Sequence, residues 1–173
     1  MPDADLEFEL DSATARLFDR AVCAKGSFFN YWLPVGLWMG LIFFGSTDLF
    51  SSQHTSRIIG PLLRWLNPNV SEETIRAVQT VVRKGWHATE YSVLGLLLWR
   101  ARRKPVKHDS RPWSWTEAAV AVLLAAVYAA TDEFHQSFVP SRGASAWDVL
   151  LDTLGALAGL FVLWWSGRRR KLW

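Results

Sequence analysis

Four long apolar runs divide the chain, and each is long enough to form a membrane-spanning helix. They cover residues 30–50, 78–99, 117–138 and 147–165. About 20 apolar residues in a helix cross a hydrocarbon core roughly 30 Å thick. The second run is the least regular, because charged residues interrupt its first half. The pattern predicts an all-α integral membrane bundle of four transmembrane helices.

A shorter apolar segment, residues 58–66, lies in the polar connection between the first two runs. It is too short to cross a membrane, so we expect an interfacial or re-entrant segment between the first two helices. Ser71, followed by two glutamates, is typical of a helix N-cap, and Ser114 opens a capping box before the third run.

Small residues occur at helical spacing in three of the runs. Gly36 and Gly40 form one GxxxG pair, and Gly155 and Gly159 form a second. Alanines recur along the third run. Such residues allow helix backbones to approach closely, so each of these faces is a candidate for helix packing.

Basic residues predict the orientation of the bundle. Six lie between the second and third runs, and four follow the fourth run. Cytoplasmic loops carry an excess of Lys and Arg, so both clusters and both termini are expected in the cytoplasm. The organisation is then a cytoplasmic or interfacial tail (residues 1–27), a transmembrane domain (28–166) and a basic cytoplasmic tail (167–173).

Composition supports membrane insertion without a cleaved signal. Half of the residues are hydrophobic and eleven are Trp, a residue that favours the interfaces between bilayer and water. The first residues are acidic and lack the basic and apolar regions of a signal peptide. The net charge is only +3, and no nucleic-acid partner is expected.

Polar residues of three runs fall at one predicted depth. A helix rises about 1.5 Å per residue, which places them roughly 14–26 Å above the basic ends, mostly in the outer half of the membrane. Ionisable residues at such depths cost roughly 2.5–3.5 kcal/mol each on insertion scales, so they predict a functional site. With Arg142 in the turn above, the candidate binding residues are Lys84, His87, Glu90, Tyr91, Tyr128, Asp132, Glu133, His135, Gln136, Asp148 and Asp152.

Helical spacing places these residues on one face of each run. Asp132 and Glu133 are adjacent and diverge by about 100°, so we expect Asp132 to face the site and Glu133 to face elsewhere. The combined pattern predicts a polar cavity that opens outward. The three stripes are Lys84–His87–Tyr91, Asp132–His135–Gln136 and Asp148–Asp152.

Several of these residues also have purely structural interpretations. Glu90 could form an ion pair with Lys84 or be protonated, and His87 could be a buried core histidine. Asp148 could act as a first-turn helix acid. Arg142 could bind a lipid phosphate.

Metal binding is one use of such a cavity. His87, Glu90, Asp132, His135 and Asp152 offer nitrogen and oxygen ligands for a divalent ion. No spacing among them matches a zinc motif, so no cofactor is predicted, and a divalent metal remains an alternative.

Two further uses need no metal. Lys84, Arg142 and His87 could hold an anionic head group, with His87, Glu90 and Asp132 orienting it or transferring protons. Ion or proton translocation is less favoured, because the halves of the runs nearest the basic clusters lack polar residues.

The combined motifs resemble the VanZ-like family of bacterial membrane proteins. The resemblance covers residues 36–165 and implies a small inner-membrane protein with several helices. The family takes its name from a protein that lowers susceptibility to teicoplanin, and it often has Asn at the position of Asp152. The matching residues are Lys84, His87, Glu90, Tyr91, Tyr128, Asp132, Glu133, Gln136, Pro140, Ser141, Arg142, Asp148, Asp152 and Gly155, with Ser51–Gln53 after the first run.

The leading hypothesis is therefore a cell-envelope protein that binds an anionic molecule in the outer half of the membrane. A lipid-linked cell-wall precursor, a phospholipid head group or a lipophilic glycopeptide would suit this depth. The alternative is a membrane-embedded enzyme, metal-assisted or not, that acts on a lipid-linked substrate.

Overall fold

The structure of the chain is a computed structural model. Within the part of the chain that it describes, every regular element is a helix. The described residues are 28–46, 52–105, 111–138 and 145–172.

Three of the described helices have the length and apolarity of membrane spans. They are the N-terminal span (Phe28–Gly45), α4 (Trp115–Gln136) and α5 (Ala146–Arg169). The other two are α2 (Ser52–Leu66) and α3 (Glu72–Arg103). The all-α prediction and three of the predicted spans thus agree with the structure.

Helix α3 corresponds to the second predicted run, residues 78–99, but its charged first half separates it from the three apolar helices. It starts at Glu72, as the Ser71 N-cap predicted, and the Ser71 hydroxyl accepts a bond from the backbone N–H of Thr74 at 3.1 Å. Its 32 residues make it about 48 Å long. The second half lies at the centre of the bundle, where Tyr91 and Leu94 are fully buried.

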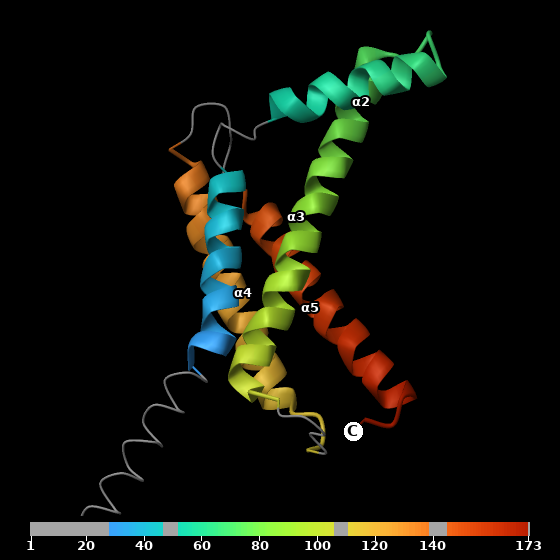
Figure 1. The fold of residues 1–173 in the computed structure, drawn as a ribbon. Helices are drawn as coiled ribbons and strands as arrows, with labels where there is room; N and C mark the ends of the chain where they lie inside the picture. The colour runs from blue at the N-terminus through green and yellow to red at the C-terminus, as the bar shows by residue number, and fades with distance from the viewer. Residues whose placement is uncertain (1–27, 47–51, 106–110, 139–144, 173) are drawn as a thin grey trace, which may run out of the picture.

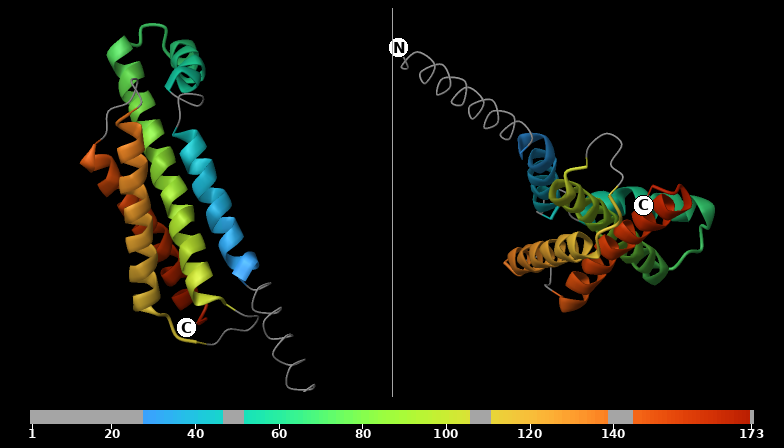
Figure 2. Two further views of the ribbon diagram at one scale, coloured as in Figure 1. Left: turned by 90° about the vertical axis from the view of Figure 1, so that its left-hand side faces the viewer. Right: turned by 90° about the horizontal axis from the view of Figure 1, so that it is seen from below.

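The four long helices alternate in direction (Figures 1 and 2). The start of the N-terminal span, the end of α3, the start of α4 and the end of α5 all lie at one end of the bundle. Arginines occupy the last turns of both α3 and α5 there, and we call this the basic end. The opposite end is the far end. Both predicted basic clusters therefore lie on the same side.

Helix α2 runs across the far end instead of between the long helices (Figure 1). It packs on the start of α3, and Arg64 forms an ion pair with Glu72. Leu62, Trp65 and Leu66 are largely exposed. This arrangement favours an interfacial segment over a re-entrant one.

The contact between α3 and α5 depends on glycine. A Cβ at Gly155 would lie 2.3 Å from the carbonyl oxygen of Ala88, and one at Gly159 would lie 2.4 Å from the Ser92 hydroxyl. Gly95 of α3 faces Ala156, with 3.1 Å between the added Cβ and that side chain. No side chain fits at the first two positions, so the backbones of α3 and α5 touch there.

The other GxxxG pair has no such role in the described chain. A Cβ at Gly36 or Gly40 meets nothing within 4 Å among the residues that the structure describes. The N-terminal span uses a different kind of contact. Trp38 Nε1 donates to the carbonyl of Glu90 at 2.9 Å, and the Tyr128 hydroxyl donates to the carbonyl of Met39 at 2.6 Å.

A third bond of this kind lies at the basic end. The Tyr31 hydroxyl donates to the carbonyl of Pro105 at 2.7 Å. Val35 and Ile42 add buried apolar contacts on the same helix. Hydrogen bonds from aromatic side chains to backbone carbonyls therefore attach the N-terminal span to α3 and α4.

The glycine contact predicts the result of a matched pair of substitutions. Gly155→Ala should lower the free energy of unfolding by roughly 1–3 kcal/mol, because the added methyl overlaps the α3 backbone. Gly36→Ala should be neutral or slightly stabilising, because alanine favours helices and has space there. Thermal unfolding of both variants in detergent measures the difference. Equal unfolding midpoints would contradict the proposed backbone contact.

Candidate functional site

The last turns of α4 hold a buried hydrogen-bond cluster with the end of the N-terminal span. The Ser46 hydroxyl donates to Asp132 Oδ2 at 2.8 Å, and Gln136 Nε2 donates to the same oxygen at 2.9 Å. All three residues are buried. Asp132 therefore faces the interior, as the helical spacing predicted, and its Oδ2 atom is satisfied by two donors.

Glu133 is also buried but points to a different element. Its Oε2 accepts a bond from the backbone N–H of Ser145 at 3.0 Å. Ser145 is the N-cap of α5, so Glu133 places a negative charge at the positive end of that helix. Asp132 and Glu133 thus diverge, one toward the N-terminal span and one toward α5.

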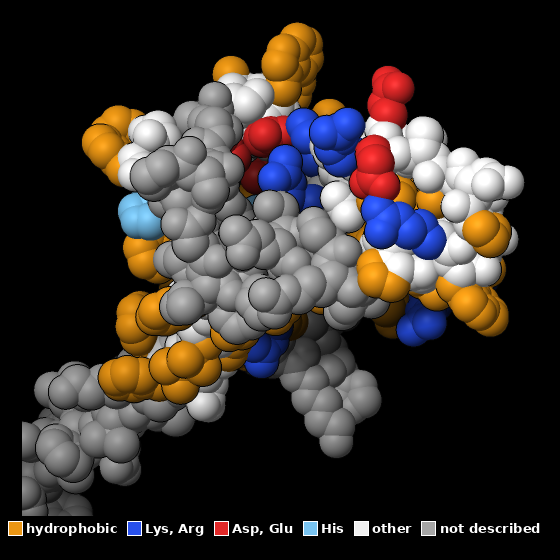
Figure 3. All heavy atoms as spheres, turned by 90° about the horizontal axis from the view of Figure 1, so that it is seen from above, with side chains coloured by type: hydrophobic (Ala, Val, Ile, Leu, Met, Phe, Trp, Pro, Cys, Tyr) orange, Lys and Arg blue, Asp and Glu red, His pale blue; other side chains and the backbone are white. Residues whose placement is uncertain are grey.

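Lys84 and Asp148 connect α3 to the first turn of α5. Lys84 Nζ lies 2.5 Å from Asp148 Oδ1. The Lys84 side chain is 41% exposed and that of Asp148 26%. The pair therefore lies at the edge of the polar region. Seen from the far end, acidic and basic side chains lie next to one another, with hydrophobic ones toward the rim (Figure 3).

Glu90 has partners on its own helix and not Lys84. Trp86 Nε1 donates to Glu90 Oε1 at 2.7 Å. His87 Nδ1 lies 3.6 Å from Glu90 Oε2. Each oxygen of the Glu90 carboxylate thus has a neighbouring nitrogen on the same helix.

Three buried oxygen atoms, one on each of α3, α4 and α5, have no hydrogen-bond partner among the described residues. They are the Tyr91 hydroxyl, Asp132 Oδ1 and Asp152 Oδ1. Each of these residues is at least 97% buried. Most buried polar atoms in native proteins are hydrogen-bonded, so three in one region mark a site with unused binding capacity.

The charge of this region is mainly negative. The carboxylates of Glu133, Asp132, Asp148 and Glu90 all interact electrostatically with Asp152. Lys84 forms an ion pair with Asp148 of this group. Like charges repel strongly where little water is present, so a bound cationic group would reduce the repulsion in this region. We call it the polar centre: Ser46, Lys84, Trp86, His87, Glu90, Tyr91, Tyr128, Asp132, Glu133, Gln136, Asp148 and Asp152.

His135, another predicted site residue, contacts the N-terminal span. His135 packs against Phe43 of the N-terminal span, with 4.5 Å between ring centroids, and its buried Nδ1 has no hydrogen-bond partner in the described ranges. Arg142 lies outside the described residues. Tyr128 borders the centre, with its ring 6.3 Å from that of Tyr91.

The described residues do not form the metal site that was one alternative from the sequence. No three His, Cys, Asp or Glu side chains come together there as metal ligands, including His87, Glu90, Asp132 and Asp152. We therefore derive no metal-dependent step.

Two members of the polar centre were not among the candidates from sequence. Ser46 ends the first apolar run, and Trp86 resembles an interfacial aromatic. A signal existed for both: Ser46 ends its run at the predicted depth of Asp132, and Trp86 lies four residues before Glu90 on the same helix.

Long apolar helices around a buried polar centre define an α-helical membrane protein. The chain belongs to the VanZ/LLP1 family, whose sequence profile matches residues 31–167. This match spans all four long helices and confirms the resemblance found in the sequence. No curated protein and no solved structure matches the chain.

Proposed function

We propose that this protein is a multi-pass cell-envelope protein of the bacterial inner membrane, with the basic end in the cytoplasm. The four long helices, α3 included, would cross the bilayer. Large exposed apolar side chains such as Leu37, Phe44 and Val162 support contact with lipid. The arginines that end α3 and α5 support the orientation.

The proposed activity is the binding of a polar head group at the polar centre, in the outer half of the membrane. The observation that carries it is the set of three buried, unpartnered polar atoms on α3, α4 and α5. A ligand that donates and accepts hydrogen bonds would satisfy all three. The Lys84–Asp148 pair at the edge would be the first charged contact for a ligand that arrives from the far end.

The charges of the polar centre refine the class of ligand. Lys84, together with Arg142 of the segment between α4 and α5, suits an anionic group such as a phosphate. The carboxylates of Asp132 and Asp152 suit an ammonium group, because a purely anionic ligand would meet repulsion there. An envelope amphiphile that carries both groups fits best, whether a phospholipid head group, a lipid-linked cell-wall precursor or a lipophilic glycopeptide.

An enzymatic role is the alternative, and the His87–Glu90 pair favours it. A carboxylate beside an imidazole nitrogen orients the ring and raises its basicity, which is how many general bases are held. His87 would transfer a proton to or from a lipid-linked substrate. Asp132 would orient the substrate from the opposite helix.

The orientation predicts a labelling pattern for single cysteines. In a Cys23→Ser background, Asn69→Cys should react with a membrane-impermeant maleimide in intact spheroplasts. Lys104→Cys should react only after the membrane is permeabilised. The reverse pattern would overturn the proposed orientation and the depth assigned to the polar centre.

The two-charge ligand predicts a ranking of short-chain phospholipid probes. Phosphatidylethanolamine should raise the thermal unfolding midpoint of the purified protein more than phosphatidylglycerol, which lacks an amine, or phosphatidylcholine, whose ammonium cannot donate. Asp152→Asn should weaken binding of the first probe about tenfold, or ~1.4 kcal/mol. Glu117→Gln, at the basic end, should not.

The possible results separate the proposals. If phosphatidylglycerol raised the unfolding midpoint as much as phosphatidylethanolamine, and Asp152→Asn changed neither shift, the site would bind an anion alone and not a two-charge ligand. No shift with any probe would overturn head-group binding. Recovery of a chemically altered probe, lost in His87→Asn, would favour the enzyme.

The family resemblance predicts a phenotype as well. We propose that the protein lowers glycopeptide susceptibility by binding the lipophilic glycopeptide or its target at the polar centre. Expression in a teicoplanin-susceptible host should raise the inhibitory concentration, and Asp132→Asn should reverse this while Glu117→Gln does not. Unchanged susceptibility with the unsubstituted protein would remove resistance from the proposal but leave the binding test intact.

A further inference from the structure

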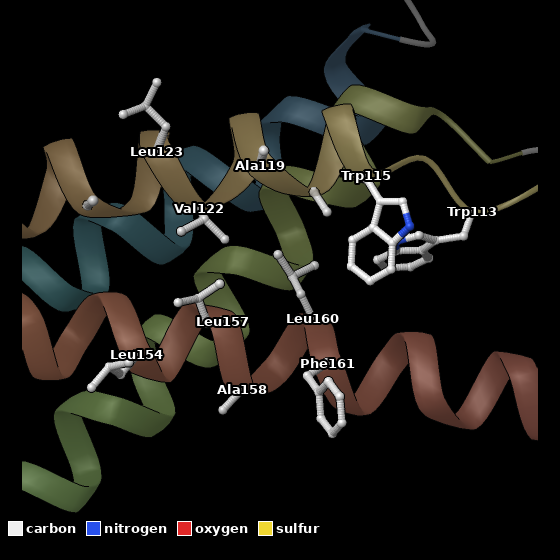
Figure 4. A pocket seen from close by; sticks show the side chains of 12 residues that line it. Trp113, Trp115, Ala119, Val122, Leu123, Leu154, Leu157, Ala158, Leu160 and Phe161 are labelled. Atoms are coloured by element: carbon white, nitrogen blue, oxygen red, sulfur yellow. The ribbon is translucent and has the colours of Figure 1, made fainter.

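A second, apolar site lies between α4 and α5, toward the basic end (Figure 4). It is an open groove of about 790 Å³. Its walls are the small residues of α4, such as Ala119 and Val122, and the larger Leu157 and Phe161 of α5. No residue of the polar centre lines this groove.

The groove follows from how α5 is held. Gly155 and Gly159 bring α5 into backbone contact with α3. The α3–α5 contact is more extensive than the α4–α5 contact, and α5 tilts away from α4 toward the basic end (Figure 1). Alanines on the facing side of α4 are too small to fill the resulting gap.

Tryptophans and arginines close the groove at the basic end. The ring of Trp115, which lines the groove, lies 5.6 Å from that of Trp164. The guanidinium of Arg168 lies 5.6 Å from the centre of the Trp164 ring, and that of Arg169 lies 4.7 Å from Trp165. No acidic side chain in the described part of the chain forms an ion pair with either arginine. The groove therefore ends near Arg168 and Arg169, which have no acidic side-chain partner among the described residues.

We propose that this groove binds an acyl chain of an anionic phospholipid whose phosphate contacts Arg168. The apolar walls suit a hydrocarbon chain, and Trp and Arg at one end suit the head-group level of a bilayer. A second copy of the protein fits less well. In a symmetric dimer, the same unpaired arginines would face one another across the interface.

Native mass spectrometry of the full chain, purified with phosphatidylglycerol or phosphatidylcholine as the added probe, tests this site. The unsubstituted protein should retain more phosphatidylglycerol. Arg168→Gln should weaken phosphatidylglycerol retention about fivefold and leave phosphatidylcholine unchanged. Arg76→Gln, an exposed arginine on α3, is the matched control and should have no effect.

Filling the groove provides a second, independent variant. Ala119→Phe should reduce retention of both lipids, whereas Ala130→Phe, an exposed alanine of α4 outside the groove, should not. If Ala119→Phe does not fold, Ala158→Phe on the α5 wall replaces it. Unchanged lipid retention in the filled variant would overturn the proposal. So would a lipid-free dimer that Ala119→Phe dissociates, because a second copy would then occupy the groove.

Discussion

The close backbone contact between α3 and α5 is the constraint on which the rest of the structure depends. Gly155 and Gly159 permit it, and they lie on the same stripe of α5 as Asp148 and Asp152. Once the glycines set the register of α5 against α3, Asp148 comes within reach of Lys84. One face of α5 thus packs against α3 near the middle of the bundle, through Gly155 and Gly159. The same face carries the two acidic residues nearer the far end.

Much of the fold could be predicted from the pattern of apolar runs and caps. The runs identified the long helices, and Ser71 and Ser114 were correctly expected to cap α3 and α4. The sequence alone could not rank the two GxxxG pairs. Gly36–Gly40 and Gly155–Gly159 have the same spacing in the sequence. Whether a pair forms a close helix contact depends on which helix packs against it, and the sequence spacing does not show this.

The polar centre could be predicted in part, because depth and helical face are readable from spacing. Both criteria placed Asp132 in the interior, where it is found. Individual partners were not readable. An ion pair between Glu90 and Lys84 was one of two structural alternatives, yet Glu90 accepts a bond from Trp86 while Lys84 pairs with Asp148 of α5. Side-chain pairing between helices depends on their relative rotation, which local spacing does not contain.

The attachment of the N-terminal span has an evolutionary consequence. Tyr31, Trp38 and Tyr128 donate to the backbone carbonyls of Pro105, Glu90 and Met39, and not to their side chains. Every residue type has a backbone carbonyl, so the acceptor positions can change identity while the contact persists. Pairwise covariation between homologous sequences should therefore be weak at these three contacts. The aromatic donors should be retained there, and contact inference from alignments would underestimate what these bonds contribute to holding the helix.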